Sequence, residues 1–246
     1  MKLLKKLLTG VAVAAAFAGS ASATPINVGG VVWDPESGFD FSGTSATTVQ
    51  NINPTTGELS GYGYISLLNN TNVSTFCPSC ELTFSFSGYL PVGGSSVPGI
   101  GGSGTSIQYT GGVLNIYVDT SLDTNGGLNL TQANTSDGTL WLSLAGHANN
   151  GVTLTGTNFF PTTLLGGGLL DVTGGLAQGN LDTNSQAYGA DLAFSSSFTR
   201  FPGNSPLNAT GTSNFSGNSI PEPASLALVG LGLVGVAAAR RRKAAK

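Results

Sequence analysis

Two cysteines, the only ones in the chain, stand three positions apart in the segment Cys77-Pro78-Ser79-Cys80. A pair at this spacing can form a local disulfide, act as a redox couple or supply part of a metal site. A redox couple would open a helix, whereas the residues after Cys80 alternate between apolar and polar as a strand does. Zinc would need two more soft ligands, and the sequence offers one distant histidine. We expect a structural disulfide, with redox chemistry as the alternative.

Acidic and amide side chains gather between residues 119 and 137. Asp119, Asp123 and Asn125 would place oxygen ligands on a turning loop, which is the kind of ligand that Ca²⁺ prefers, and Asp137 follows in the same segment. The spacing matches only a fragment of an EF-hand loop, and no glutamate closes it. Asp and Asn also stabilise turns by bonding to their own backbone. We expect turn formation and no cofactor, with Ca²⁺ binding as the alternative.

The sequence contains one histidine, His147, which is the only candidate for a histidine base. Nucleophilic hydrolysis by a Ser-His-Asp arrangement needs a positioned base, and no serine lies in a G-x-S-x-G elbow. The acidic residues are numerous enough for a glycosidase pair but form no recognisable constellation. We therefore predict no catalytic residues, a non-enzymatic protein, and a solvated His147 at a strand end. A secreted hydrolase is the alternative.

Strands must carry these residues, because apolar and polar side chains alternate with a period of two. Leu82, Phe84 and Phe86 fall on one face of a strand, and residues 113–119 and 139–146 show the same habit. Glycine makes up 37 of the 246 residues, which is typical of many tight turns. We predict an all-β fold over residues 24–200, an antiparallel β-sandwich of jelly-roll type.

The segment 139–146 is predicted to place Leu140, Leu142 and Leu144 on one face and Trp141 on the other. If aromatic residues such as Trp33, Tyr109 and Trp141 are exposed beside acidic loops, they favour a carbohydrate- or Ca²⁺-binding adhesin.

The first 23 residues predict export. Lys2, Lys5 and Lys6 precede an apolar run, and Ala21-Ser22-Ala23 has the small residues of a cleavage site. These three parts are typical of a secretory signal peptide, cleaved here after residue 23. Export to an oxidising compartment supports the disulfide prediction.

Once both ends are set aside, the chain is strongly acidic. Between residues 24 and 219, Arg200 is the only Lys or Arg, against eleven Asp and Glu. A surface without a basic patch cannot neutralise phosphates, so nucleic acid is excluded as a partner.

The chain ends in a polar segment, a motif and an anchor. Residues 201–219 predict a polar linker, and an apolar run of 16 residues, 224–239, is just long enough to cross a membrane as a helix. The cationic residues that follow place the C-terminus in the cytoplasm. They are Arg240, Arg241, Arg242 and Lys243.

Residues 220–246 resemble a PEP-CTERM sorting domain. The resemblance is carried by Pro221-Glu222-Pro223, the apolar run and the arginine cluster that follows it. It implies a Gram-negative bacterium that makes extracellular polysaccharide. It also implies recognition by exosortase, a membrane protease that removes the tail after a transient stay in the inner membrane. Members of the family are mostly cell-surface or matrix proteins, so we expect a structural component of matrix, biofilm or floc, with polysaccharide as a possible partner.

Overall fold

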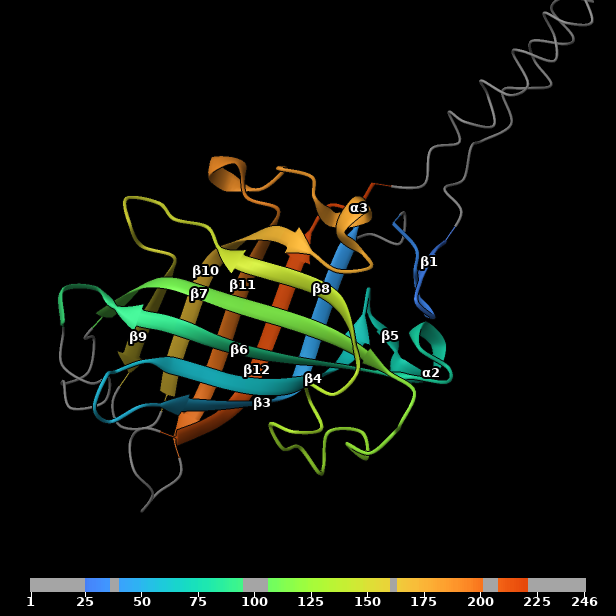
Figure 1. The fold of residues 1–246 in the computed structure, drawn as a ribbon, viewed down its shortest axis with the longest axis horizontal. Helices are drawn as coiled ribbons and strands as arrows, with labels where there is room; N and C mark the ends of the chain where they lie inside the picture. Colours follow the sequence, from blue (N-terminus) through green and yellow to red (C-terminus); the bar gives the residue numbers. More distant parts are fainter. Residues whose placement is uncertain (1–24, 36–39, 95–105, 160–162, 201–207, 221–246) are drawn as a thin grey trace, which may run out of the picture.

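A computed structural model describes residues 25–35, 40–94, 106–159, 163–200 and 208–220 (Figure 1). The predicted signal peptide and the predicted membrane helix lie outside these residues. The strands are β1 (Ile26–Val28), β2 (Val31–Trp33), β3 (Phe41–Ile52), β4 (Leu59–Leu68), β5 (Thr71–Asn72), β6 (Glu81–Pro91), β7 (Ser106–Asp119), β8 (Thr139–Gly146), β9 (Leu154–Phe159), β10 (Thr163–Gly174), β11 (Leu192–Arg200) and β12 (Asn208–Gly217). Short helical turns join them at α2 (Val73–Phe76), η1 (Val92–Gly94), α3 (Gln178–Leu181) and η2 (Ala187–Gly189).

The main sheet closes on itself. Antiparallel neighbours follow in the order β11, β12, β3, β4, β6, β7, β8 and β10, and β10 pairs again with β11. The predicted all-β, antiparallel class is therefore confirmed, but the structure is a closed eight-stranded barrel with extra strands and not a two-sheet sandwich. Alternation along a strand is the same in both architectures, because each buries one face of every strand.

Two short strands, β8 and β9, occupy one strand position in the barrel. Along β7, residues 113–118 pair with β8 and residues 106–109 pair with β9. Along β10, the same two strands follow one another, with Gly146 opposite Leu170 and Leu154 opposite Gly168. β8 and β9 therefore share one position in the barrel, between β7 and β10. Residues 147–153 form the loop that joins them.

The barrel interior is the core, and most of the predicted alternation is correct. Leu82, Phe84 and Phe86 of β6 are buried, as are Leu114 and Ile116 of β7. Phe84 packs edge-on against Phe215 of β12, across the barrel, with ring centroids 5.3 Å apart. Edge-to-face pairs of this kind add to the stabilisation gained from burying the rings.

The prediction for β8 is wrong at its first residues. Leu140 is 38% exposed, whereas Trp141 is fully buried together with Leu142. The pairing of β7 with β8 shifts register between Ile116 and Tyr117, which lie opposite Leu142 and Leu140. A bulge of this kind places two residues opposite one and redirects a side chain. Trp141 thus faces the core, and alternation alone could not reveal it.

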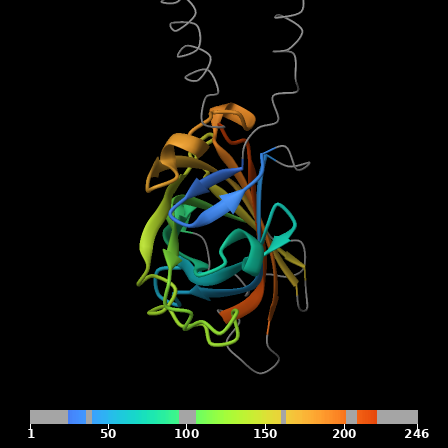
Figure 2. The ribbon, with the colours of Figure 1, turned by 90° about the vertical axis from the view of Figure 1, so that its right-hand side faces the viewer.

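Aromatic rings close one end of the barrel. Trp33 of β2 packs edge-on against both Phe41 and Trp141, with centroids 6.0 and 5.8 Å away. The Trp141 indole N–H donates to the Val28 carbonyl at 3.0 Å, which ties the β1–β2 hairpin to the barrel. Figure 2 looks onto this end, where the hairpin crosses the barrel near α2.

The predicted linker over residues 201–219 is wrong for its second half. Residues 208–217 form β12, which pairs with β3 on one side and with β11 on the other. Ser213 and Phe215 of this strand are fully buried. The segment looks polar because its inward positions are mostly small, and small residues can line the inside of a narrow barrel.

Candidate functional site

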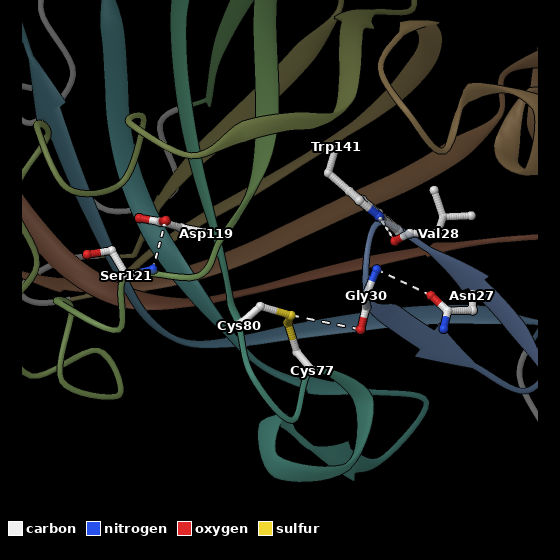
Figure 3. The surroundings of a disulfide bond; sticks show 8 residues. All are labelled: Asn27, Val28, Gly30, Cys77, Cys80, Asp119, Ser121 and Trp141. Carbon is white, nitrogen blue, oxygen red and sulfur yellow. Dashed lines mark hydrogen bonds between the residues drawn. A yellow bond between two sulfur atoms is a disulfide. The ribbon is translucent and has the colours of Figure 1, made fainter.

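The cysteine pair lies beneath the β1–β2 hairpin (Figure 3). Cys77 and Cys80 form the predicted disulfide, and both residues are buried. The Cys80 sulfur lies 3.8 Å from the carbonyl oxygen of Gly30 in the hairpin turn. The pair follows the end of α2 and does not open a helix, because the Cys77 N–H donates to the Val73 carbonyl. Neither cysteine therefore lies at a helix N-terminus, which is the position that activates a redox thiol.

Three carboxylates converge where β6 begins and β7 ends. One oxygen each from Glu81, Asp119 and Asp123 lies within 4.8 Å of the other two. Glu81 and Asp119 are direct neighbours in the β6–β7 register, and Asp123 comes from the loop that follows β7. Asp119 and Asp123 were singled out from the sequence, but Glu81 was not, because only the strand register brings it there.

Glu81 is the buried member of this cluster. Its exposed fraction is 2%, and both of its carboxylate oxygens accept hydrogen bonds from Thr124, one from the backbone N–H and one from the hydroxyl. Burial raises the pKa of Glu81 above its ordinary value of 4.5; the bonds from Thr124 oppose this, and the charges of Asp123 and Asp119 add to it. Burial, helped by the Glu81 charge, also raises the pKa of Tyr64.

We expect Glu81 to make the protein less stable as the pH rises above 4.5. A carboxyl with a raised folded-state pKa holds its proton more tightly when folded. Its stabilising contribution is fully present below the unfolded pKa and is lost as the pH rises through the folded pKa. In the variant Glu81→Gln, the free energy of unfolding should therefore fall less than in the wild type between about pH 4 and about pH 7. Urea unfolding at a series of pH values measures the difference.

Glu58→Gln is the matched control, since Glu58 stands at the opposite end of the β4–β6 pair and accepts a hydrogen bond from the Gly88 N–H. It controls for the loss of one carboxylate from the same pair of strands. Identical profiles for the wild type and Glu81→Gln would contradict the assignment.

The same three carboxylates keep the calcium hypothesis open. Clustered oxygen ligands suit Ca²⁺, and an ion that binds the folded state raises its melting temperature by mass action. If calcium binds, millimolar Ca²⁺ will raise the melting temperature of the wild type but not that of Glu81→Gln. A melting curve that is the same in chelator and in Ca²⁺ would remove the hypothesis.

The other predicted ligands are divided between two hollows. Asn125, in a left-handed backbone conformation with φ of 50°, lines a hollow of about 350 Å³ together with Glu81 and the disulfide. Asp137 lies apart from this hollow and lines another, of about 270 Å³, with Asp119. The four predicted residues therefore do not form one shared cage.

His147 has a partner that the sequence did not reveal. It is the first residue of the loop between β8 and β9, and its Nδ1 lies 2.7 Å from Asp171 Oδ1 on β10. Its side chain is only 18% exposed, so the prediction of a solvated residue is wrong. Within the described residues, no hydroxyl group is hydrogen-bonded to His147, so this pair lacks the nucleophile of a Ser-His-Asp arrangement.

The aromatic residues considered for carbohydrate binding are not on the surface. Trp33, Tyr109 and Trp141 are 3%, 3% and 0% exposed. They cannot form an open platform for sugar rings. A polar hollow of about 330 Å³ does lie beside His147, where Gln108, Asn149, Asn150 and Thr155 contribute to its walls.

Hydrogen bonds fix the last described residues, Ser219 and Ile220, to the rest of the protein. The Trp33 indole N–H donates to Ser219 Oγ, whose hydroxyl in turn donates to the Asp40 carbonyl, both at 3.2 Å. The Ile220 N–H donates to the Asn180 carbonyl at 2.7 Å, and the Asn180 side chain donates back to the Ile220 carbonyl. The barrel therefore holds the chain directly before Pro221, without the predicted linker. In Figure 1, the described chain begins and ends at this same end of the barrel.

Sorting residues 221–246 lie outside the described part of the chain. Among the described residues, no helix has the length and apolar character needed to span a membrane. A family model of the PEP-CTERM protein-sorting motif matches residues 219–243, so the chain carries a PEP-CTERM sorting motif at these residues. No curated protein and no solved structure matches the chain.

The motif indicates how the protein is exported and processed. It implies export through a membrane-anchored intermediate to the cell surface, and processing by exosortase, a membrane protease.

Proposed function

We propose that the mature barrel is a non-enzymatic component of the extracellular polysaccharide matrix. The observation that carries this proposal is the sorting motif, which begins at residue 219, within the last residues that the barrel holds in place. Cutting the chain beyond Ile220 would release an intact barrel, because all the strands among the described residues lie before that residue.

The charge of the exported part fits this role. With Arg200 as the only Lys or Arg between residues 24 and 219, the barrel repels its own copies and stays soluble at the cell surface. Its disulfide suits an oxidising exterior.

Deleting the gene tests the proposal. Loss of floc or biofilm cohesion, restored by the wild-type gene but not by one that ends at Ile220, is the expected result. The truncated gene is the matched control, since it supplies the whole barrel without the sorting motif. Unchanged cohesion after deletion would overturn the matrix role.

Polysaccharide binding is the second candidate function, and the hollow beside His147 favours it. Amide and imidazole groups there can donate and accept hydrogen bonds with sugar hydroxyls. Retention on matrix polysaccharide that is weakened by Gln108→Ala and His147→Ala would support an adhesin. A hydrolase would instead release reducing ends from the polysaccharide.

A further inference from the structure

Large apolar side chains are exposed in the segment between β10 and β11 and at the end of the described chain. Leu176, Tyr188 and Ile220 have exposed fractions of 51%, 73% and 46%. The segment, drawn in orange in Figures 1 and 2, lies on the side of the barrel where the described chain begins and ends. Ile220 is joined to it by the two hydrogen bonds with Asn180 of α3. We call the surface formed by residues 175–190 and Ile220 the exit face.

The loop that carries Tyr188 is fixed to the barrel. The Asp191 carboxylate, only 3% exposed, accepts hydrogen bonds from three backbone N–H groups. They belong to Val172, Thr183 and Asn184, at 2.6 to 2.7 Å. Tyr188 itself has φ of 60°, a left-handed conformation that bulky residues rarely adopt and that is more common at functional sites. The loop therefore presents the Tyr188 ring to solvent from a fixed backbone.

The exit face carries little charge. Asp182 is the only Asp, Glu, Lys or Arg among residues 175–190. The loop between β7 and β8 also exposes apolar side chains, Leu122 and Leu128, but it contains Asp123 and Asp137. In Figures 1 and 2 this yellow-green loop lies on the side of the barrel away from the chain ends. Anionic lipids would repel its carboxylates, so the exit face is the better surface for contact with a bilayer.

The sequence brings the exit face close to the membrane. The predicted apolar run begins at residue 224, and a chain of four residues spans at most about 14 Å from Ile220 to that point. The sorting motif implies a membrane-anchored intermediate. While the tail is anchored, the tether gives even a weak contact between barrel and lipid a high effective concentration.

We propose that the exit face lies against the lipid headgroups in the anchored intermediate, with Tyr188 and Leu176 in contact with the interface. Tyrosine is enriched at membrane interfaces because its ring is apolar and its hydroxyl is polar. Leucine adds apolar surface that lipid can cover. The proposal rests on the sorting motif and does not depend on a role in the matrix.

The test uses the chain with its tail, purified from cells that lack exosortase and reconstituted in vesicles of phosphatidylethanolamine and phosphatidylglycerol. Lipids with a nitroxide on the headgroup should quench the added fluorescence of Tyr188→Trp, after subtraction of the wild-type signal. Leu128→Trp is the control, since Leu128 is 86% exposed on the loop between β7 and β8, and it should not be quenched. Equal quenching of both variants, or none of Tyr188→Trp, would overturn the proposal. Quenching that appears only after exosortase is added would assign the surface to the protease and would equally overturn it.

Tyr188→Gly isolates the contribution of the ring. Glycine adopts a left-handed conformation without strain, so the variant removes the side chain and keeps the loop. With Leu176→Trp as the probe, Tyr188→Gly should lower the ratio of docked to undocked protein at least about fivefold, which corresponds to about 1 kcal/mol. Leu128→Ala should leave that ratio unchanged. An unchanged ratio in Tyr188→Gly would contradict the assignment, and a melting curve confirms that each variant is folded.

Discussion

Replacing Pro221, Glu222 and Pro223 by alanine leaves the full-length chain in the membrane fraction, and the shorter mature form is almost completely lost. Proline lacks a backbone N–H and disfavours helix in the residue before it, so the two prolines favour an extended strip that a protease can grip. The barrel holds Ser219 and Ile220, the two residues directly before Pro221, by hydrogen bonds. Comparing the intact masses of membrane and released protein measures the outcome.

Deleting residues 240–243 provides the contrast, because it removes most of the cationic cluster and leaves Pro221-Glu222-Pro223 in place. If the cations stop transfer, unprocessed chain should then appear outside the membrane fraction. Normal processing of the triple-alanine variant would show that Pro-Glu-Pro is not what exosortase recognises.

Replacing Trp141 by alanine destabilises the barrel by about 3–5 kcal/mol, which lowers the melting temperature by roughly 10 °C. Trp141 is fully buried, contacts the rings of Trp33 and Phe41, and donates to the Val28 carbonyl. Its removal therefore opens a cavity and also loosens the β1–β2 hairpin. Thermal and urea unfolding measure the loss.

Trp141→Phe separates the two contributions, since it keeps most of the ring packing and removes the N–H. We expect a smaller loss, of about 1–3 kcal/mol, from the Val28 carbonyl that is left without its donor. A stability of Trp141→Ala equal to that of the wild type would contradict the buried position and return Trp141 to the surface.

The alternation of apolar and polar residues does not predict the burial of Trp141 or of the residues in β12. Alternation correctly placed Leu82, Phe84 and Phe86 inside, because this part of β6 follows a regular pleat. It failed at Trp141, where a bulge changes the phase and leaves no local mark in the sequence. It also failed for residues 208–217, whose burial depends on pairing with β3 from the far end of the chain.

Closure of the barrel and the acidic cluster could not be predicted for the same reason. The β10–β11 pairing that closes the sheet joins neighbours in the sequence, but the β12–β3 pairing that completes the ring spans most of the chain. Glu81 meets Asp119 only through the β6–β7 register. The disulfide between Cys77 and Cys80 could be predicted because it is local. The sorting motif could be predicted because its parts follow one another in the sequence.

Mass spectrometry of the protein from the matrix fraction shows whether the C-terminal tail has been removed. We predict that the mature chain starts at Thr24, retains the β12 peptide over residues 208–217, and ends before the apolar run at 224–239. All peptides from residues 226–240 should be restricted to the membrane fraction. Finding those peptides on matrix protein would show that the tail is retained, and would contradict processing through the sorting motif.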